Sequence, residues 1–175
     1  MINIIKFIDT ISVKVAHFTK YALLIIATAI GYEVVARYIF NSPTMWSNDV
    51  CKQTLCFIAA LGGAYDYLTE THVRVDVFYI KLSDRKKAIL DMITSVMFFI
   101  FIIVLIVESS KMAINSWAVH ERAVSTWAPP LYYIKTVIPI GTFLLLLQGV
   151  SKFLKDFYLI KNGHPYTVDY GVKES

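Results

Sequence analysis

Four long runs of mostly apolar residues divide the chain, and each has about the length of a membrane crossing. They cover residues 21–40, 46–68, 88–107 and 131–147, the last with an extension to about residue 158. A helix rises 1.5 Å per residue, so roughly 20 apolar residues span a bilayer. Inside lipid, each backbone polar group must find its partner within the segment, which favours helix over strand. The pattern predicts an all-α integral membrane protein with four transmembrane helices.

Apolar residues also recur at three- and four-residue steps before the first run. They are Ile4, Ile8, Ile11, Val15 and Phe18. Lys6, Asp9 and Lys20 are among the polar positions between them. This pattern predicts an N-terminal amphipathic helix that lies on the membrane surface or extends the first crossing. We do not expect a cleavable signal peptide, because the first run continues into Glu33 and Arg37 without a small-residue cleavage pattern.

Composition agrees with a membrane protein. Of the 175 residues, 57% are hydrophobic and 17% charged, and the mean hydropathy is +0.57. Soluble domains are about 45–50% apolar and about 25% charged. We expect a single four-helix membrane domain over residues 1–160 and a cytoplasmic tail over residues 161–175.

Lysine and arginine are concentrated in the connection between the second and third predicted helices and after the last helix, which lie on the same side of the membrane. Five lie between the second and third helices and four follow the last helix, at Arg74, Lys81, Arg85, Lys86, Lys87, Lys152, Lys155, Lys161 and Lys173. The first connection, NSPT, has none. The positive-inside rule then places both termini and the middle loop in the cytoplasm. We interpret the net charge of +4 as these basic loops and not as a nucleic-acid site.

The middle loop contains the alternating segment VRVDVFY, which by itself is typical of a strand. An isolated strand has no partner for its edges, so we favour a short interfacial helix. Its apolar face would contain Val75, Phe78, Tyr79 and Leu82. We expect His72, Arg74 and Asp76 to lie there at the level of the lipid headgroups.

The second apolar run contains a stripe of polar and small residues at helical spacing. Its members are Asp49, Gln53, Cys56, Ala60 and Ala64, with Gly62 and Gly63 beside it. Small residues let another helix approach closely, and polar residues can hydrogen-bond across the contact. This contact lies either within the four-helix unit or with a separate protein. In the fourth run, Pro139 is expected to kink the helix and Gly141 to allow close approach.

Sequence patterns of catalysis are absent from the chain. Glu33 and Arg37 have the i, i+4 spacing of a helical ion pair, which we interpret as structural. All four histidines fall at or outside the predicted membrane boundaries, which argues against a haem-binding bundle. We find no phosphate loop, nucleophile motif or metal cluster, and therefore predict no catalytic, cofactor-binding or metal-binding residues and no enzyme activity.

Five short motifs resemble those of a known family. They are RYIFN at residues 37–41, WSND at 46–49, LGGAY at 61–65, HVRVD at 72–76 and IPIG at 138–141. In this order they resemble the small membrane subunit of tripartite ATP-independent periplasmic (TRAP) transporters, the DctQ-like type. One departure is Asn48, where the family often has a second acid after the tryptophan.

The resemblance implies a non-catalytic scaffold without a cofactor. In this family the small subunit binds a large membrane subunit, which carries the sodium ions and the substrate, usually an organic acid that a periplasmic binding protein delivers. Membrane lipids are expected as further partners. The predicted contacts with the large subunit are Trp46, Asp49, Gln53, Ala60, Gly63, Ala64, Pro139 and Gly141.

Two alternatives come from other classes of protein. A self-sufficient small transporter would use a membrane carboxylate such as Glu33 or Asp49. A membrane anchor for a redox enzyme would hold a partner and a quinone. The first moves solute as a purified chain, and the second co-purifies with haem or quinone.

Overall fold

The computed structural model describes residues 2–69 and 84–162 and is built from helices and turns. Within these ranges the helices are α1 (Ile2–Thr19), α2 (Ala22–Tyr38), α3 (Ser47–Leu68), α5 (Asp84–Ala118) and α6 (Tyr132–Asn162). The predicted all-α architecture is confirmed. The interfacial helix, with His72, Arg74 and Asp76, was expected in residues 70–83, which lie outside the described residues, as do residues 163–175.

Helices α2 and α3 begin and end within two residues of their predicted bounds, whereas α5 is longer than predicted. The apolar run ends at Val107, but the helix continues to Ala118. The first polar turn beyond the run is stabilised by an i, i+3 ion pair, with 2.7 Å between Lys111 Nζ and Glu108 Oε1. At 1.5 Å per residue α5 is about 52 Å long, well beyond the roughly 30 Å of a bilayer core.

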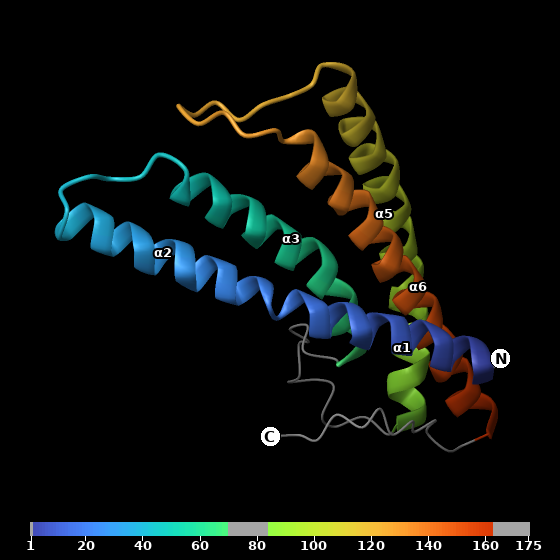
Figure 1. Cartoon of the computed structure of the whole chain (residues 1–175). Coiled ribbons are helices and arrows are strands. Elements are labelled where there is room, and N and C mark those ends of the chain that lie inside the picture. The colour runs from blue at the N-terminus through green and yellow to red at the C-terminus, as the bar shows by residue number, and fades with distance from the viewer. Residues whose placement is uncertain (1, 70–83, 163–175) are drawn as a thin grey trace.

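Helix α1 runs almost directly into α2 (Figure 1). The junction is a short tightened turn, in which the N–H of Tyr21 bonds to Phe18 and that of Leu23 to Lys20, both at 3.2 Å. These are i to i−3 bonds, as in a 3₁₀ turn, so the helical path is offset without being broken. The near-continuous path of α1 and α2 agrees with an N-terminal helix that extends the first crossing, and the position of α1 relative to the membrane stays a prediction.

The face that α1 buries against the rest of the chain includes polar residues of the predicted amphipathic helix. Ile8, Asp9 and Ser12 are buried, whereas Phe18 is 67% exposed. The polar residues face inward because α6 supplies hydrogen-bonding partners for them. The apolar ones can face outward because lipid solvates them as well as protein does.

The remaining helices form two antiparallel pairs that diverge (Figure 1). Helix α3 returns alongside α2, and α6 returns alongside α5. Helix α1 packs on α3 and α6 at the end where the pairs meet. The molecule therefore consists of two arms, the α2–α3 pair and the α5–α6 pair, which are joined at one end.

Helices α3 and α6 approach each other at Ala60 and Gly141. A Cβ atom added to Gly141 would lie 2.0 Å from the carbonyl oxygen of Ala60. At Gly149 an added Cβ would lie 2.4 Å from the Phe98 ring of α5. Helix α6 thus uses two glycines to approach a backbone on one side and an aromatic ring on the other. It also continues through Pro139, which lies inside the helix.

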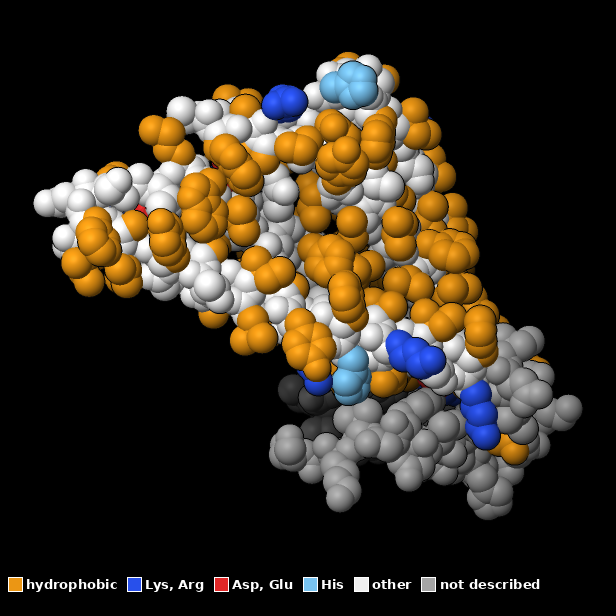
Figure 2. All heavy atoms as spheres, viewed as in Figure 1, with side chains coloured by type: hydrophobic (Ala, Val, Ile, Leu, Met, Phe, Trp, Pro, Cys, Tyr) orange, Lys and Arg blue, Asp and Glu red, His pale blue; other side chains and the backbone are white. Residues whose placement is uncertain are grey.

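In the described part of the chain, three helical segments are long and apolar enough to cross a membrane. They are Ile5–Tyr38, Ile89–Ala118 and Tyr132–Ile160. Figure 2 shows apolar side chains over the middle of one face, with Lys, Arg and His side chains towards its two ends. Helix α3 is less apolar, because Asp49, Lys52 and Asp66 lie on it. Four crossings and cytoplasmic termini stay predictions that agree with this arrangement.

Gly141→Ala should lower the free energy of unfolding by about 1–3 kcal/mol, because the new methyl group overlaps the Ala60 carbonyl and must push α3 and α6 apart. The measurement is unfolding of the purified chain in mixed micelles by increasing SDS. Gly31→Ala on α2 is the matched control, since an added Cβ there meets nothing within 4 Å. An equal loss in both variants would contradict the close approach.

Candidate functional site

The first turn of α3 is fastened to two other parts of the chain. Ser47 Oγ donates to the carbonyl oxygen of Ala29 in α2, at 3.0 Å. Asp49 is 7% exposed, and its carboxylate accepts a hydrogen bond from Ser125 Oγ in the connection between α5 and α6. This connection therefore spans the gap between the two arms, as Figure 1 also shows.

The connection over residues 119–131 is a narrow hairpin. The N–H of Leu131 bonds to the carbonyl of Glu121, and that of Ala123 to the carbonyl of Pro129, both at 2.9 Å. Ala128 has a φ of 45°, and its N–H bonds to Ser125 Oγ at 3.1 Å. These bonds give the hairpin a defined shape, with Ser125 placed to reach Asp49.

An ion pair holds the base of this hairpin to α6. Lys135 Nζ lies 2.6 Å from Glu121 Oε2, and both side chains are partly exposed. The hydrogen bonds from Lys135 keep the pKa of Glu121 below its ordinary value of 4.5. Glu121 is therefore ionised near neutral pH and pairs with Lys135.

The predicted pair of Glu33 and Arg37 is present in α2. Arg37 Nη2 lies 2.5 Å from Glu33 Oε1. The other carboxylate oxygen of Glu33 accepts hydrogen bonds from Thr44, including its N–H at 3.0 Å. Glu33 thus closes the turn between α2 and α3, which supports the structural interpretation of this pair.

The predicted partner-contact residues fall into two groups. Those buried within this chain are Asp49, Ala64 and Gly141, and Ala60 is half-buried with its backbone against Gly141. Ala64 is 1% exposed, and Ala60 faces Gly141. The others keep some accessible surface, and they are Trp46, Gln53, Gly63 and Pro139. Trp46 packs on Tyr32, with 5.6 Å between ring centroids. A contact of either group with another protein stays a prediction.

Gln53 and Gly63 line open hollows on different sides of α3. Gln53 faces a hollow of about 430 Å³ formed with Tyr21, Ile25 and other residues of α1, α2, α3 and α6. Its Nε2 has no hydrogen-bond partner in the described structure. Gly63 borders a hollow of about 330 Å³ between the two arms, and an added Cβ would meet nothing within 4 Å.

A buried polar cluster between α1 and α6 was not predicted. Asp9 is 0% exposed, and its Oδ1 accepts hydrogen bonds from Gln148 Nε2 and Ser151 Oγ, each at 2.8 Å. Its Oδ2 lies 2.7 Å from Lys155 Nζ. Ser12 Oγ donates to Gln148 Oε1 at 2.9 Å. We call these five residues the Asp9 cluster.

Neighbouring Lys152 points from α6 to two other helices. Its Nζ lies 3.1 Å from Asp91 Oδ2 of α5 and 5.7 Å from the centre of the Tyr67 ring of α3. The sequence places Lys152 and Lys155 in a basic membrane flank. In the structure they also tie α6 to α1, α3 and α5.

A sequence signal for the Asp9 cluster does exist. Gln148, Ser151 and Lys155 are spaced i, i+3, i+7 after the apolar segment FLLLL, which places them on one helical face. Asp9 and Ser12 are likewise i, i+3 among apolar residues. Matching polar stripes on two apolar helices indicate a shared contact.

Within the ranges 2–69 and 84–162, no three His, Cys, Asp or Glu side chains come together as a metal site. Cys51 and Cys56 are free thiols. The polar side chains described above mainly form contacts between helices, and this arrangement is suited to fixing the helices relative to one another.

The model of one protein family matches residues 26–158. Its description is "Tripartite ATP-independent periplasmic transporters, DctQ component". The chain belongs to this family. The match covers α3 and α5 entirely, with most of α2 and α6, so the resemblance of the five motifs is confirmed at the level of the family. No curated protein matches the sequence. As a DctQ component, the chain is a membrane protein and one part of a three-part transporter.

The matched region divides the Asp9 cluster. Gln148, Ser151 and Lys155 lie within the part that matches the DctQ family, whereas Asp9 and Ser12 precede it. Helix α1 is therefore an N-terminal element held on the matched helical unit by polar contacts.

Asp9→Leu should destabilise the chain by about 3–5 kcal/mol, because Gln148 and Ser151 lose a buried acceptor and Lys155 loses its contact with the carboxylate. Lys111→Met is the control, since both members of its ion pair are more than half exposed and the expected loss is below about 1 kcal/mol. Unfolding by SDS in mixed micelles measures both. Adding Lys155→Met to Asp9→Leu should recover part of the loss, and no recovery would contradict the pairing.

The hairpin should open in acid. Because the pKa of Glu121 is lower when it is paired, the stabilisation is complete above the ordinary value of 4.5 and is lost as pH falls below it through the lowered pKa. The protection factor of the Leu131 amide in hydrogen exchange should fall over this range. Glu121→Gln should remove this step, and an unchanged step in that variant would show that another group titrates.

Proposed function

We propose that the chain is the non-catalytic small membrane subunit of a TRAP transporter. It scaffolds the large membrane subunit during sodium-driven uptake of an organic acid, which a periplasmic binding protein delivers. The proposal places the chain in the bacterial inner membrane with both termini in the cytoplasm. The observation that carries it is the family match over residues 26–158.

The geometry supports a scaffold. Buried polar groups of the described residues are used to fix helices to one another, as in the Asp9 cluster and at Asp49. Large apolar side chains along α2 and α5 remain exposed, among them Leu24, Ile30, Met97 and Phe101. Exposed apolar surface in a membrane protein faces lipid or another membrane subunit.

We infer that the large subunit contacts α3 through Gln53 and Gly63. Gln53 is half-buried and borders an open hollow of about 430 Å³ on one side of α3. The space before Gly63 is open between the arms. A helix of the large subunit seated there would pack closely on Gly63, and close packing drives association in lipid.

Gly63→Leu should reduce co-purification of the large subunit at least about tenfold, because the new side chain occupies the space into which a partner helix would pack. The measurement is affinity purification of the tagged chain, co-expressed with the large subunit. Gly62→Leu is the matched control, since its added Cβ also meets nothing within 4 Å but borders a different hollow. Wild-type recovery of the large subunit with Gly63→Leu would contradict this interface.

Transport itself tests the assignment. Proteoliposomes containing both membrane subunits and the binding protein should accumulate an organic acid when a sodium gradient is applied, and those containing this chain alone should not. Uptake by the chain alone would favour the self-sufficient transporter. Stoichiometric haem or quinone in the purified chain would favour the redox anchor.

A further inference from the structure

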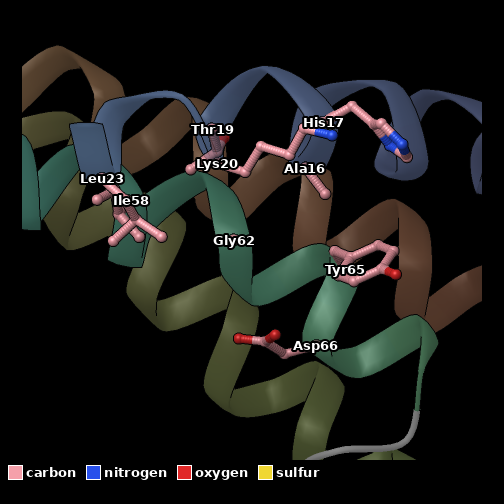
Figure 3. A pocket seen from close by; sticks show the side chains of 9 residues that line it. All are labelled: Ala16, His17, Thr19, Lys20, Leu23, Ile58, Gly62, Tyr65 and Asp66. Carbon is pink, nitrogen blue, oxygen red and sulfur yellow. The ribbon is translucent and has the colours of Figure 1, made fainter. Parts of the chain in front are cut away.

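A groove lies where α1 passes into α2 and crosses α3. It encloses about 280 Å³ and is lined mostly by apolar surface. Figure 3 shows that its two ends differ in chemistry. Leu23 and Ile58 lie together at one end, and His17 lies at the other. The groove is therefore amphipathic along its length.

The middle of the groove is open because α3 has a glycine there. An added Cβ on Gly62 would meet no atom within 4 Å, so no side chain of the described structure fills this space. Atoms that line an empty groove in a membrane protein lose dispersion contacts along its wall. In a membrane the surrounding lipid can supply the missing atoms.

Basic groups lie at the polar end. His17 and Lys20 are both exposed, and Lys14 is exposed one turn before His17. Figure 3 shows the Lys20 side chain reaching along α1 towards His17. The acid that lines the groove, Asp66, points away from this pair and is engaged by another group. The charge presented at this end suits an anion.

The depth of the groove suits a phospholipid. Lys20 precedes the first residue of the predicted crossing, and Leu23 and Ile58 lie within the apolar runs. An ammonium group at this level can meet a phosphate while the wall below it meets a hydrocarbon chain. A free anion could contact the ammonium group but would leave the apolar wall of the groove without a contact.

We propose that this groove binds one acidic phospholipid, with its phosphate at His17 and Lys20 and one acyl chain along Leu23, Gly62 and Ile58. The inference requires that the chain lies in a membrane and does not depend on which transporter it serves. It adds a lipid-mediated attachment between α1 and α3 to the direct contacts that α1 makes with α3 and α6.

The test is native mass spectrometry of the full chain in detergent, with phosphatidylglycerol and phosphatidylcholine added in equal amounts. Wild type should retain one phosphatidylglycerol in preference to phosphatidylcholine. Gly62→Leu should weaken retention of both lipids by roughly tenfold, because leucine fills the path of the acyl chain. Lys20→Gln should keep the binding but reduce the preference for phosphatidylglycerol by about fivefold.

Gly63→Leu is the control and should bind lipid like wild type, because it borders the hollow on another side of α3. Inorganic phosphate should not displace the lipid, and displacement would show recognition of the phosphate alone. Equal retention in Gly62→Leu, or no preference for phosphatidylglycerol in wild type, would overturn the proposal. Co-purification of the large subunit is measured in a separate experiment with the same variants. Failure of the proposed interface at Gly63 would therefore leave the lipid-binding result unchanged.

Discussion

The buried carboxylate of Asp9 fixes the position of α1 against α6. A charge taken out of water is strongly destabilised unless it is paired and hydrogen-bonded. Lys155, Gln148 and Ser151 meet this need together, and all three lie on one face of α6. Sliding α1 by one turn would separate the carboxylate from its partners. Polar contacts therefore set the register between these helices, where apolar contacts would allow several.

Helix α6 connects the parts of the molecule. Glycine at position 141 brings it against α3, and Lys152 reaches Asp91 of α5 and the Tyr67 ring of α3. In lipid, apolar burial provides little driving force between helices, so close packing and polar bonds must provide it. Both occur along α6. This explains how a chain with so much exposed apolar surface keeps a defined arrangement of helices.

The pattern of apolar residues predicted the helices well where lipid and helix coincide. For α2 and α3 the apolar run and the helix end almost together. For α5 they do not, because Glu108 and Lys111 continue the helix beyond the lipid-compatible run. Hydropathy reports where a segment can meet lipid, whereas the end of a helix depends on local hydrogen bonds.

Which face of each helix packs on other helices was harder to predict, because hydropathy does not distinguish lipid from protein as the neighbour of an apolar side chain. In water, Phe18 would be expected inside and Asp9 outside, and the structure has the reverse. The stripe on α3 was recognised from its small and polar residues, but their spacing alone did not reveal that Ala60 meets Gly141 and that Asp49 meets Ser125. Such pairings depend on how the two arms diverge, which no local pattern encodes.

The hydrogen bond from Ser125 to Asp49 also has a mechanical meaning. The α2–α3 arm, the α5–α6 arm and the connection between them form the three sides of a triangle, closed at its far corner by this bond (Figure 1). Two helical pairs joined at one end alone could change the angle between them, and a contact at their far ends limits this change. Moving the far ends of the arms apart would therefore require breaking the contact between Asp49 and Ser125 or changing the shape of the hairpin.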